Sequence, residues 1–178
     1  MIKTTFLAAL LSVMCLSLLS TEARSQMFAG YDSFCGIPVL VQPTDQTALA
    51  TYDANGNPII ILDPGVYQNQ TASRIFVIAH ECGHHINGHL KGFRAFERVH
   101  GNATAKQERG ADCWAAEQLA FLGLERELIR VIYEMAHSGA PTFGYPSGKD
   151  RAVTIQLCAM RAGADLPSYP TIVEGRAF

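Results

Sequence analysis

The chain has 178 residues, 48% of them hydrophobic and 17% charged, with a formal net charge of −2 at pH 7. This near balance of charge, without a basic stripe, argues against nucleic acid as a partner. The length fits a single domain, and apart from the N-terminal segment no apolar stretch is long enough to span a membrane.

The first 25 residues have the pattern of a secretory signal peptide. Lys3 precedes an apolar run that is too short to span a bilayer comfortably, and the small residues Ala23 and Ser25 suit a signal peptidase. We expect this segment to be cleaved, with an uncleaved membrane anchor as the alternative. Residues 26–178 would then form one exported domain, periplasmic or extracellular.

The residues before position 65 predict a small, mostly antiparallel sheet. Ile37 to Val41 form one apolar run, and Ile59 to Leu62 form the most β-prone run of the chain. Asn55-Gly56 separates two strand-like segments, which is a strong signal for a hairpin. Pro58 has no N–H to donate, so we expect it at the start of a strand or on an edge strand.

Beyond residue 70 the apolar residues recur at helical spacing. Glycines and prolines break this pattern, above all between residues 138 and 148. The predicted helices run from about 71 to 88 or 92, 103 to 122, 125 to 137 and 149 to 162. A sheet followed by helices indicates an α+β fold with a core of about four helices.

The segment AHECGHHINGH, residues 79–89, is unusually rich in metal-binding side chains. His80 and His84 are four residues apart, so one helix presents both imidazoles on the same side, one turn apart. Two imidazoles in this arrangement can bind one zinc ion, and Glu81 beside them can act as a general base. H-E-x-x-H is a zinc peptidase motif for this reason, although the same residues can also coincide by chance on a solvated helix.

A catalytic zinc ion needs a third protein ligand. Asn87 and Leu90 stand where the longer metzincin motif has Gly and His, which excludes that class. His85 projects about 100° away from His84 around the helix axis. His89 lies at an offset of five from His84, so neither histidine completes the site easily.

The next predicted helix supplies a third ligand and a support for it. Glu108 lies on a helix that a short connection can fold back against the first one. Asp112, one turn further, can accept a hydrogen bond from the free N–H of a ligand imidazole. Alone, this spacing of carboxylates is typical of a solvated helix face, but beside H-E-x-x-H it indicates a metal site.

His80-Glu81-x-x-His84 followed by Glu108-x-x-x-Asp112 resembles the gluzincin pattern of zinc metallopeptidases. It is especially similar to the small neutral zinc metallopeptidases and to relatives of the CAAX-processing and heat-shock membrane proteases. The resemblance covers about residues 70–160. It implies that the two histidines and Glu108 bind one zinc ion per chain, that Glu81 is the catalytic base and that Asp112 supports a ligand.

Those relatives often carry a His-Pro pair followed by an arginine, and Tyr145 and Arg151 occupy the corresponding places here. Both are therefore secondary catalytic candidates. Were Tyr145 to face the zinc ion, its hydroxyl would stabilise the oxyanion of a tetrahedral intermediate, whereas the alternative is a loop tyrosine packed on the core. Arg151 has the alternative role of pairing with Asp112 or Glu108 and holding the last helix to the site.

Four cysteines remain after the signal segment, and an even number in an oxidising compartment favours two disulfides. They lie too far apart in the sequence for a C-x-x-C zinc site. Cys82 points away from the ligand direction of its helix. Of the three possible pairings, we expect Cys35 with Cys82, joining the sheet to the first helix, and Cys113 with Cys158, joining the second helix to the fourth.

These residues predict an exported zinc metallopeptidase of gluzincin type, in which Glu81 is the general base for a zinc-activated water. A peptide or protein substrate would add as a strand to a sheet edge. Ile59–Leu62 suits that edge, or equally a strand buried in the core. The alternatives are an inactive zinc-binding scaffold or binding module, a zinc amidohydrolase of cell-wall amides, and a metal-binding protein that also uses His85, His89 and His100.

Overall fold

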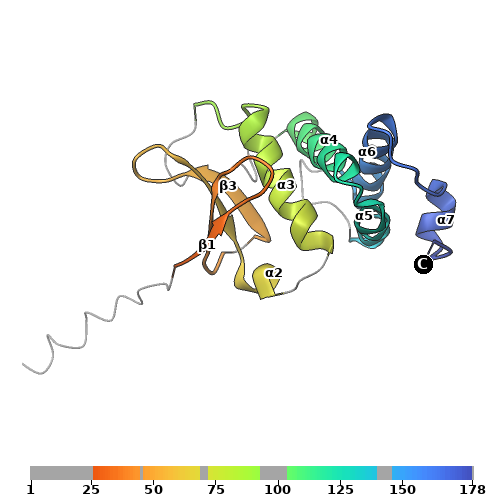
Figure 1. The fold of residues 1–178 in the computed structure, drawn as a ribbon, viewed down its shortest axis with the longest axis horizontal. Coiled ribbons are helices and arrows are strands. Elements are labelled where there is room, and N and C mark those ends of the chain that lie inside the picture. Colours follow the sequence, from red (N-terminus) through yellow and green to blue (C-terminus); the bar gives the residue numbers. More distant parts are fainter. Residues whose placement is uncertain (1–25, 45, 69–71, 93–103, 140–145, 178) are drawn as a thin grey trace, which may run out of the picture.

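The computed structural model describes residues 26–44, 46–68, 72–92, 104–139 and 146–177. A four-stranded sheet is followed by helices, so the α+β fold that we expected is confirmed (Figure 1). The predicted signal segment, residues 1–25, lies outside the described residues. Within the described ranges, no helix has both the length and the apolar character to cross a membrane.

The sheet has the strand order β1-β2-β4-β3. Its strands are β1 (Met27–Tyr31), β2 (Pro38–Val41), β3 (Ala48–Tyr52) and β4 (Pro58–Leu62). β1 with β2 and β3 with β4 are antiparallel pairs, whereas β2 and β4 are parallel. The predicted hairpin joins β3 to β4, and Gly56 takes a φ of +82° in its turn, a value that glycine adopts without steric cost.

The apolar run Ile59–Leu62 is an interior strand, so its interpretation as a substrate-binding edge is wrong. β4 pairs with β2 on one side and with β3 on the other. Its four apolar side chains are at most 3% exposed. A strand buried on both faces needs a continuous apolar run, which is the pattern that this segment has. β1 and β3 form the two edges of the sheet instead.

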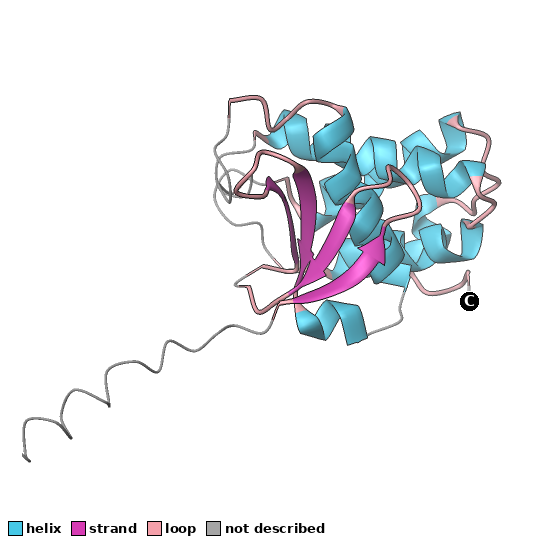
Figure 2. Ribbon diagram, turned by 60° about the vertical axis from the view of Figure 1, so that its left-hand side comes forward, coloured by secondary structure: helices cyan, strands magenta, loops and turns pink. Residues whose placement is uncertain are grey.

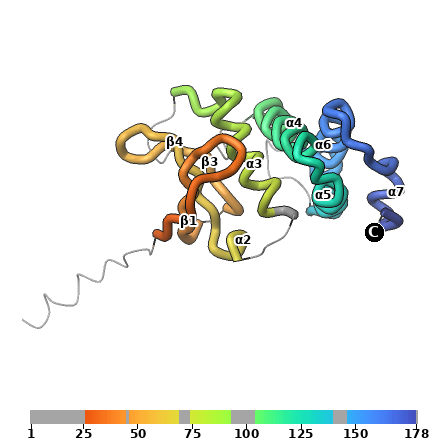
Figure 3. Tube along the Cα trace, in the orientation of Figure 1, coloured from red at the N-terminus to blue at the C-terminus, as the bar shows by residue number. Residues whose placement is uncertain are grey.

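Four long helices follow the sheet, near their predicted limits. They are α3 (Ala72–Ile86), α4 (Ala105–Phe121), α5 (Glu125–His137) and α6 (Gly148–Arg161). Two five-residue helices were not expected, namely α2 (Pro64–Gln68) and α7 (Tyr169–Val173). Pro170 lies in the first turn of α7, where its missing N–H has no intrahelical partner to lose. Figure 3 follows this path along the chain.

The helix α3 lies between the sheet and the other long helices (Figures 1 and 2). One side of it packs through Cys82 on a core that includes Ile60 and Leu62 of the sheet. Its other side packs through Phe76 and Ala79 on the core formed by α4, α5 and α6. A side chain on the remaining face of α3 is therefore close to both layers.

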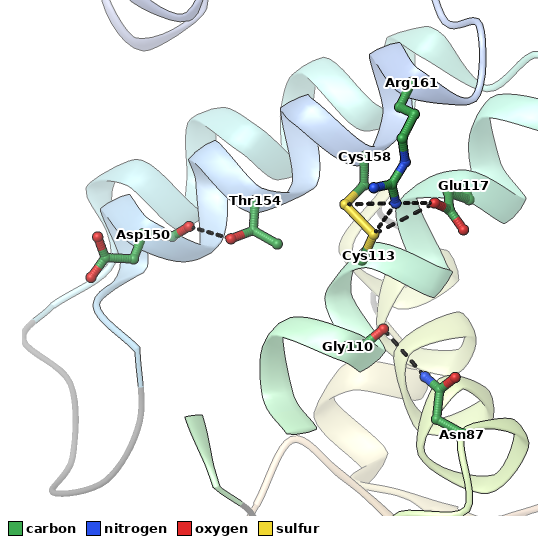
Figure 4. Close-up of a disulfide and its surroundings, with 8 residues drawn as sticks. All are labelled: Asn87, Gly110, Cys113, Glu117, Asp150, Thr154, Cys158 and Arg161. Atoms are coloured by element: carbon green, nitrogen blue, oxygen red, sulfur yellow. Dashed lines mark hydrogen bonds and ion pairs between the residues drawn. A yellow bond between two sulfur atoms is a disulfide. The ribbon is translucent and has the colours of Figure 1, made fainter. Parts of the chain in front are cut away.

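The two disulfides have the pairing that we expected, one between the sheet side and α3 and one within the helical layer. Cys35, which follows β1, is bonded to Cys82 of α3, with the Cα atoms 6.0 Å apart. Cys113 of α4 is bonded to Cys158 of α6, with the Cα atoms 5.2 Å apart. Figure 4 shows the second bond between the two helices, with Arg161 and Glu117 beside it. Cys82 is thus engaged on the side of α3 that faces the sheet.

Candidate metal centre

The helix α3 carries His80, Glu81 and His84 in its C-terminal half. Successive turns of the helix bring the two imidazoles together, with the Nε2 atoms 3.1 Å apart. His80 is 4% exposed, Glu81 3% and His84 0%. Three polar side chains buried this completely require polar partners, because an unpaired buried polar group is costly.

The N-terminal turn of α4 brings Glu108 to the two histidines. Thr104 caps this helix, since its hydroxyl accepts from the N–H of Gln107 and its own N–H donates to the Gln107 side chain. This reciprocal cap fixes where α4 begins. Glu108 then lies in the first turn and is fully buried.

A glycine in α3 allows α4 to come close enough. A Cβ atom placed on Gly83 would lie 3.0 Å from Cα and 3.1 Å from the carbonyl oxygen of Ala111. The two backbones are therefore nearly in contact, and a larger residue at position 83 would push them apart. This approach is what allows the short Glu108 side chain to reach both histidines of the facing helix.

Donor atoms of three side chains converge between the helices. Oε2 of Glu108 is 3.3 Å from Nε2 of His80, and Oε1 is 3.6 Å from Nε2 of His84. Tetrahedral zinc with bonds of about 2.0–2.1 Å holds its ligand atoms roughly 3.3 Å from one another. The donor types and their spacing therefore fit a zinc ion. Two further groups of metal-ligating types in the described ranges each contain a disulfide-bonded cysteine pair.

Asp112 and Arg151 support His80 from behind. Nδ1 of His80 is 2.9 Å from Oδ1 of Asp112, which leaves Nε2 facing the cluster. Arg151 of α6 donates to both oxygens of Asp112, from Nε at 2.8 Å and from Nη2 at 2.7 Å. Burial raises the pKa of Asp112, but the bonds from Arg151 outweigh burial and lower it to about 2. Asp112 is therefore ionised at neutral pH.

The two histidines of the cluster differ in charge. Burial lowers the pKa of His80, but hydrogen bonds to Asp112 and Glu108 outweigh burial and raise it to about 10. Burial, and next the charge of His80, lower the pKa of His84 to about 4. His80 thus carries a proton where the metal would bind, and His84 does not.

Glu81 points from the same helix toward the edge of the sheet. Its Oε2 accepts a hydrogen bond of 2.7 Å from the backbone N–H of Ala50 in β3. Ala50 lies opposite Ile60 in the β3–β4 ladder. Because its N–H donates to Glu81, this N–H points away from β4. The base candidate therefore joins the metal cluster to the edge strand.

The sequence analysis set His89 aside as a third ligand, but in the structure its ring contacts the cluster. Its Nδ1 is 3.1 Å from Nδ1 of His84. The signal that identifies it is the Gly88-His89 pair, because a glycine that ends a helix turns the next side chain back toward it. His85 points elsewhere and hydrogen-bonds the carbonyl oxygen of Ile59. Arg151 contacts Asp112, whereas Tyr145 and His100 lie outside the described residues.

Comparison with known proteins places the chain in a family. The model of peptidase family M78, described as the IrrE N-terminal-like domain, matches residues 35–137. No curated protein and no solved structure matches the chain. The match spans more than half of the 178 residues and includes the sheet from β2 onward, α3, α4 and α5. The chain belongs to this metallopeptidase-like family, whereas α6 with Arg151 lies beyond the matched span.

Proposed function

We propose that this member of peptidase family M78 is an exported, zinc-dependent peptidase of gluzincin type. The observation that carries the proposal is the convergence of donor atoms from three side chains, His80, His84 and Glu108. The two Nε2 atoms are 3.1 Å apart, and each lies 3.3–3.6 Å from one oxygen of the Glu108 carboxylate. Two disulfides support export, because such bonds persist in oxidising compartments.

Each residue of the cluster has a distinct role in this proposal. His80, His84 and Glu108 hold the zinc ion, and Asp112 fixes the ring of His80 with Nε2 toward it. A bound zinc ion supplies a Lewis acid that acidifies water and stabilises negative charge on a carbonyl oxygen. Glu81 accepts the proton of the attacking water and later delivers it to the leaving amine.

A peptide substrate follows from the position of β3. This strand forms the edge of the sheet beside α3, and its Ala50 N–H donates to Glu81. An extended peptide that lies along this edge would have its backbone next to Glu81, as strand addition requires. Because Glu81 is only 3% exposed, the surroundings must open before a peptide reaches it.

Substitution of the base tests the proposed chemistry. Glu81→Gln removes the proton acceptor but none of the metal ligands, so zinc content should stay near one ion per chain. Cleavage of a mixture of unstructured fluorogenic peptides should fall by roughly 10²–10⁴-fold. Glu117→Gln is the matched control, because this carboxylate on α4 pairs with Arg161 outside the cluster.

Removal of the third ligand tests the metal site itself. Glu108→Ala should lose zinc, as measured by metal analysis after dialysis against a weak chelator. Full zinc occupancy in this variant would contradict the ligand set. Cleavage at the wild-type rate by Glu81→Gln would contradict the role of the base.

A second function is favoured by one observation, the nearly complete burial of the cluster. Closed sites are typical of structural zinc, whereas catalytic sites keep a position open for water. A zinc-binding module without peptidase activity would bind one zinc ion but cleave no peptide in any variant. The same two measurements therefore separate the two functions.

A further inference from the structure

The end of α3 is a Schellman motif that turns the chain back on itself. Gly88 has a φ of +67°, its N–H donates to the carbonyl oxygen of His85, and the N–H of His89 donates to that of His84. In this motif the residue after the glycine lies against the residue five positions earlier. A hydrophobic pair often occupies these two positions, but here both are histidines.

The two rings meet through their Nδ1 atoms. These atoms are 3.1 Å apart, and the rings are nearly perpendicular, at 71°, with their centroids separated by 5.1 Å. The other nitrogen of His84, Nε2, is the one that faces His80 and Glu108. The contact with His89 therefore lies on the side of the His84 ring opposite the metal cluster.

Coordination of zinc determines where the protons lie. An imidazole that binds a metal through Nε2 carries its proton on Nδ1. His84 then donates from Nδ1, and His89 must accept with an unprotonated Nδ1 and carry its own proton on Nε2. Metal-ligating histidines usually donate this proton to a carboxylate, a carbonyl oxygen or water, so a second imidazole is a less common acceptor.

We propose that His89 is a positioning residue of the metal centre, whose Nδ1 accepts the Nδ1–H of His84 and thereby holds Nε2 of His84 toward the zinc ion. This inference rests on the proposed zinc site but not on peptidase activity. It assigns to the Gly88-His89 pair a function beyond ending the helix.

The neighbouring helix holds His89 in place. A Cβ atom on Gly110 of α4 would lie 3.3 Å from Cε1 and 3.5 Å from Nε2 of His89, so the ring rests against the glycine. Asn87 donates from Nδ2 to the carbonyl oxygen of Gly110 at 3.3 Å and fastens the end of α3 to α4 (Figure 4). The acceptor is thus held by contacts from two helices.

Zinc affinity of the full chain, measured by competition with a chromophoric chelator, tests this role. His89→Phe keeps an aromatic ring of similar size but removes the acceptor, and we expect zinc affinity to fall by about 10–100-fold. His89→Gln offers a side-chain oxygen as acceptor and should recover part of this loss. His85→Phe is the matched control, because His85 is also half-buried but bonds Ile59 rather than His84.

The visible spectrum of the Co²⁺-substituted protein provides a readout that packing alone would not move. We expect it to change in His89→Phe and to stay unchanged in His85→Phe, with both variants folded by circular dichroism. Wild-type affinity in a folded His89→Phe, or equal losses in both variants, would overturn the proposal. A wild-type protein that binds no zinc would instead overturn the proposed function, and this inference with it. Zinc binding without peptidase activity would leave the role of His89 standing.

Discussion

The two histidines of the metal cluster are supported in opposite ways. His80 is held by a fully buried carboxylate, which in turn pairs with Arg151 through two hydrogen bonds. His84 is held by His89, an uncharged and half-buried ring. His80 thus depends on charged side chains from two other helices, α4 and α6, whereas His84 depends on the local turn that ends its own helix.

Loss of the support for His80 and loss of the support for His84 should therefore affect different properties of the protein. The Asp112–Arg151 pair joins α4 to α6, so its loss should affect folding as well as the proposed metal site. Breaking a buried ion pair leaves an uncompensated charge. His89 joins no distant elements through charge, so its loss should affect the metal and leave the fold nearly intact.

The largest effect is expected from Asp112→Ala. This change leaves Arg151 without its carboxylate partner and removes the acceptor for His80, so the free energy of unfolding should fall by about 3–5 kcal/mol. Zinc affinity should also fall by about 10–100-fold. Denaturant titration and chelator competition measure the two effects. Asp165→Ala, at an exposed aspartate, is the control, and unchanged zinc affinity in folded Asp112→Ala would contradict the comparison.

A moderate effect is expected from pH on the metal-free protein. The raised pKa of His80, about 10, gives stability that is complete below its usual value near 6.5 and is lost as the pH rises toward 10. The lowered pKa of His84, about 4, removes stability as the pH falls from 6.5 toward 4. The melting temperature without zinc should therefore peak near pH 6.5.

Single variants separate the two sides of this peak. His80→Gln should flatten the alkaline side and His84→Gln the acidic side, by a few degrees each, since about 1 kcal/mol corresponds to roughly 2–4 °C in a domain of this size. Added zinc should raise the melting temperature more at pH 9 than at pH 6.5, because the metal displaces the proton of His80. An alkaline side that survives in His80→Gln would show that another group causes it.

The smallest effect is expected from Gly110→Ala. The added methyl group would lie 3.3 Å from the ring of His89 and 3.8 Å from the side chain of Asn87. Zinc affinity should fall by roughly 3-fold, a fraction of the loss typical for removal of such a support. The free energy of unfolding should stay the same or rise by up to about 1 kcal/mol, because alanine favours the helix interior more than glycine does. A parallel loss of both quantities would contradict the separation of the two supports.

Much of the fold was predictable because local patterns dominate it. The four long helices begin and end near glycines and polar caps that the sequence displays, and Asn55-Gly56 marked the β3–β4 hairpin. The short α2 and α7 were missed, because five residues carry too little periodicity to stand out. The position of β4 inside the sheet was left open, because an apolar run indicates burial but not which strands lie beside it.

The sequence by itself determined the H-E-x-x-H arrangement, because four residues of helix always place two side chains one turn apart. It also pointed to Glu108 and Asp112 by their spacing, although their approach to α3 depends on Gly83 meeting Ala111 across the helix interface. The sequence also holds a local signal for His89, the glycine that ends α3, but a helix period applied past Gly88 gives the wrong direction, so the structure was needed to show its contact with His84. Contacts within one helix follow from its geometry, whereas contacts across a turn or between helices depend on how closely the backbones pack.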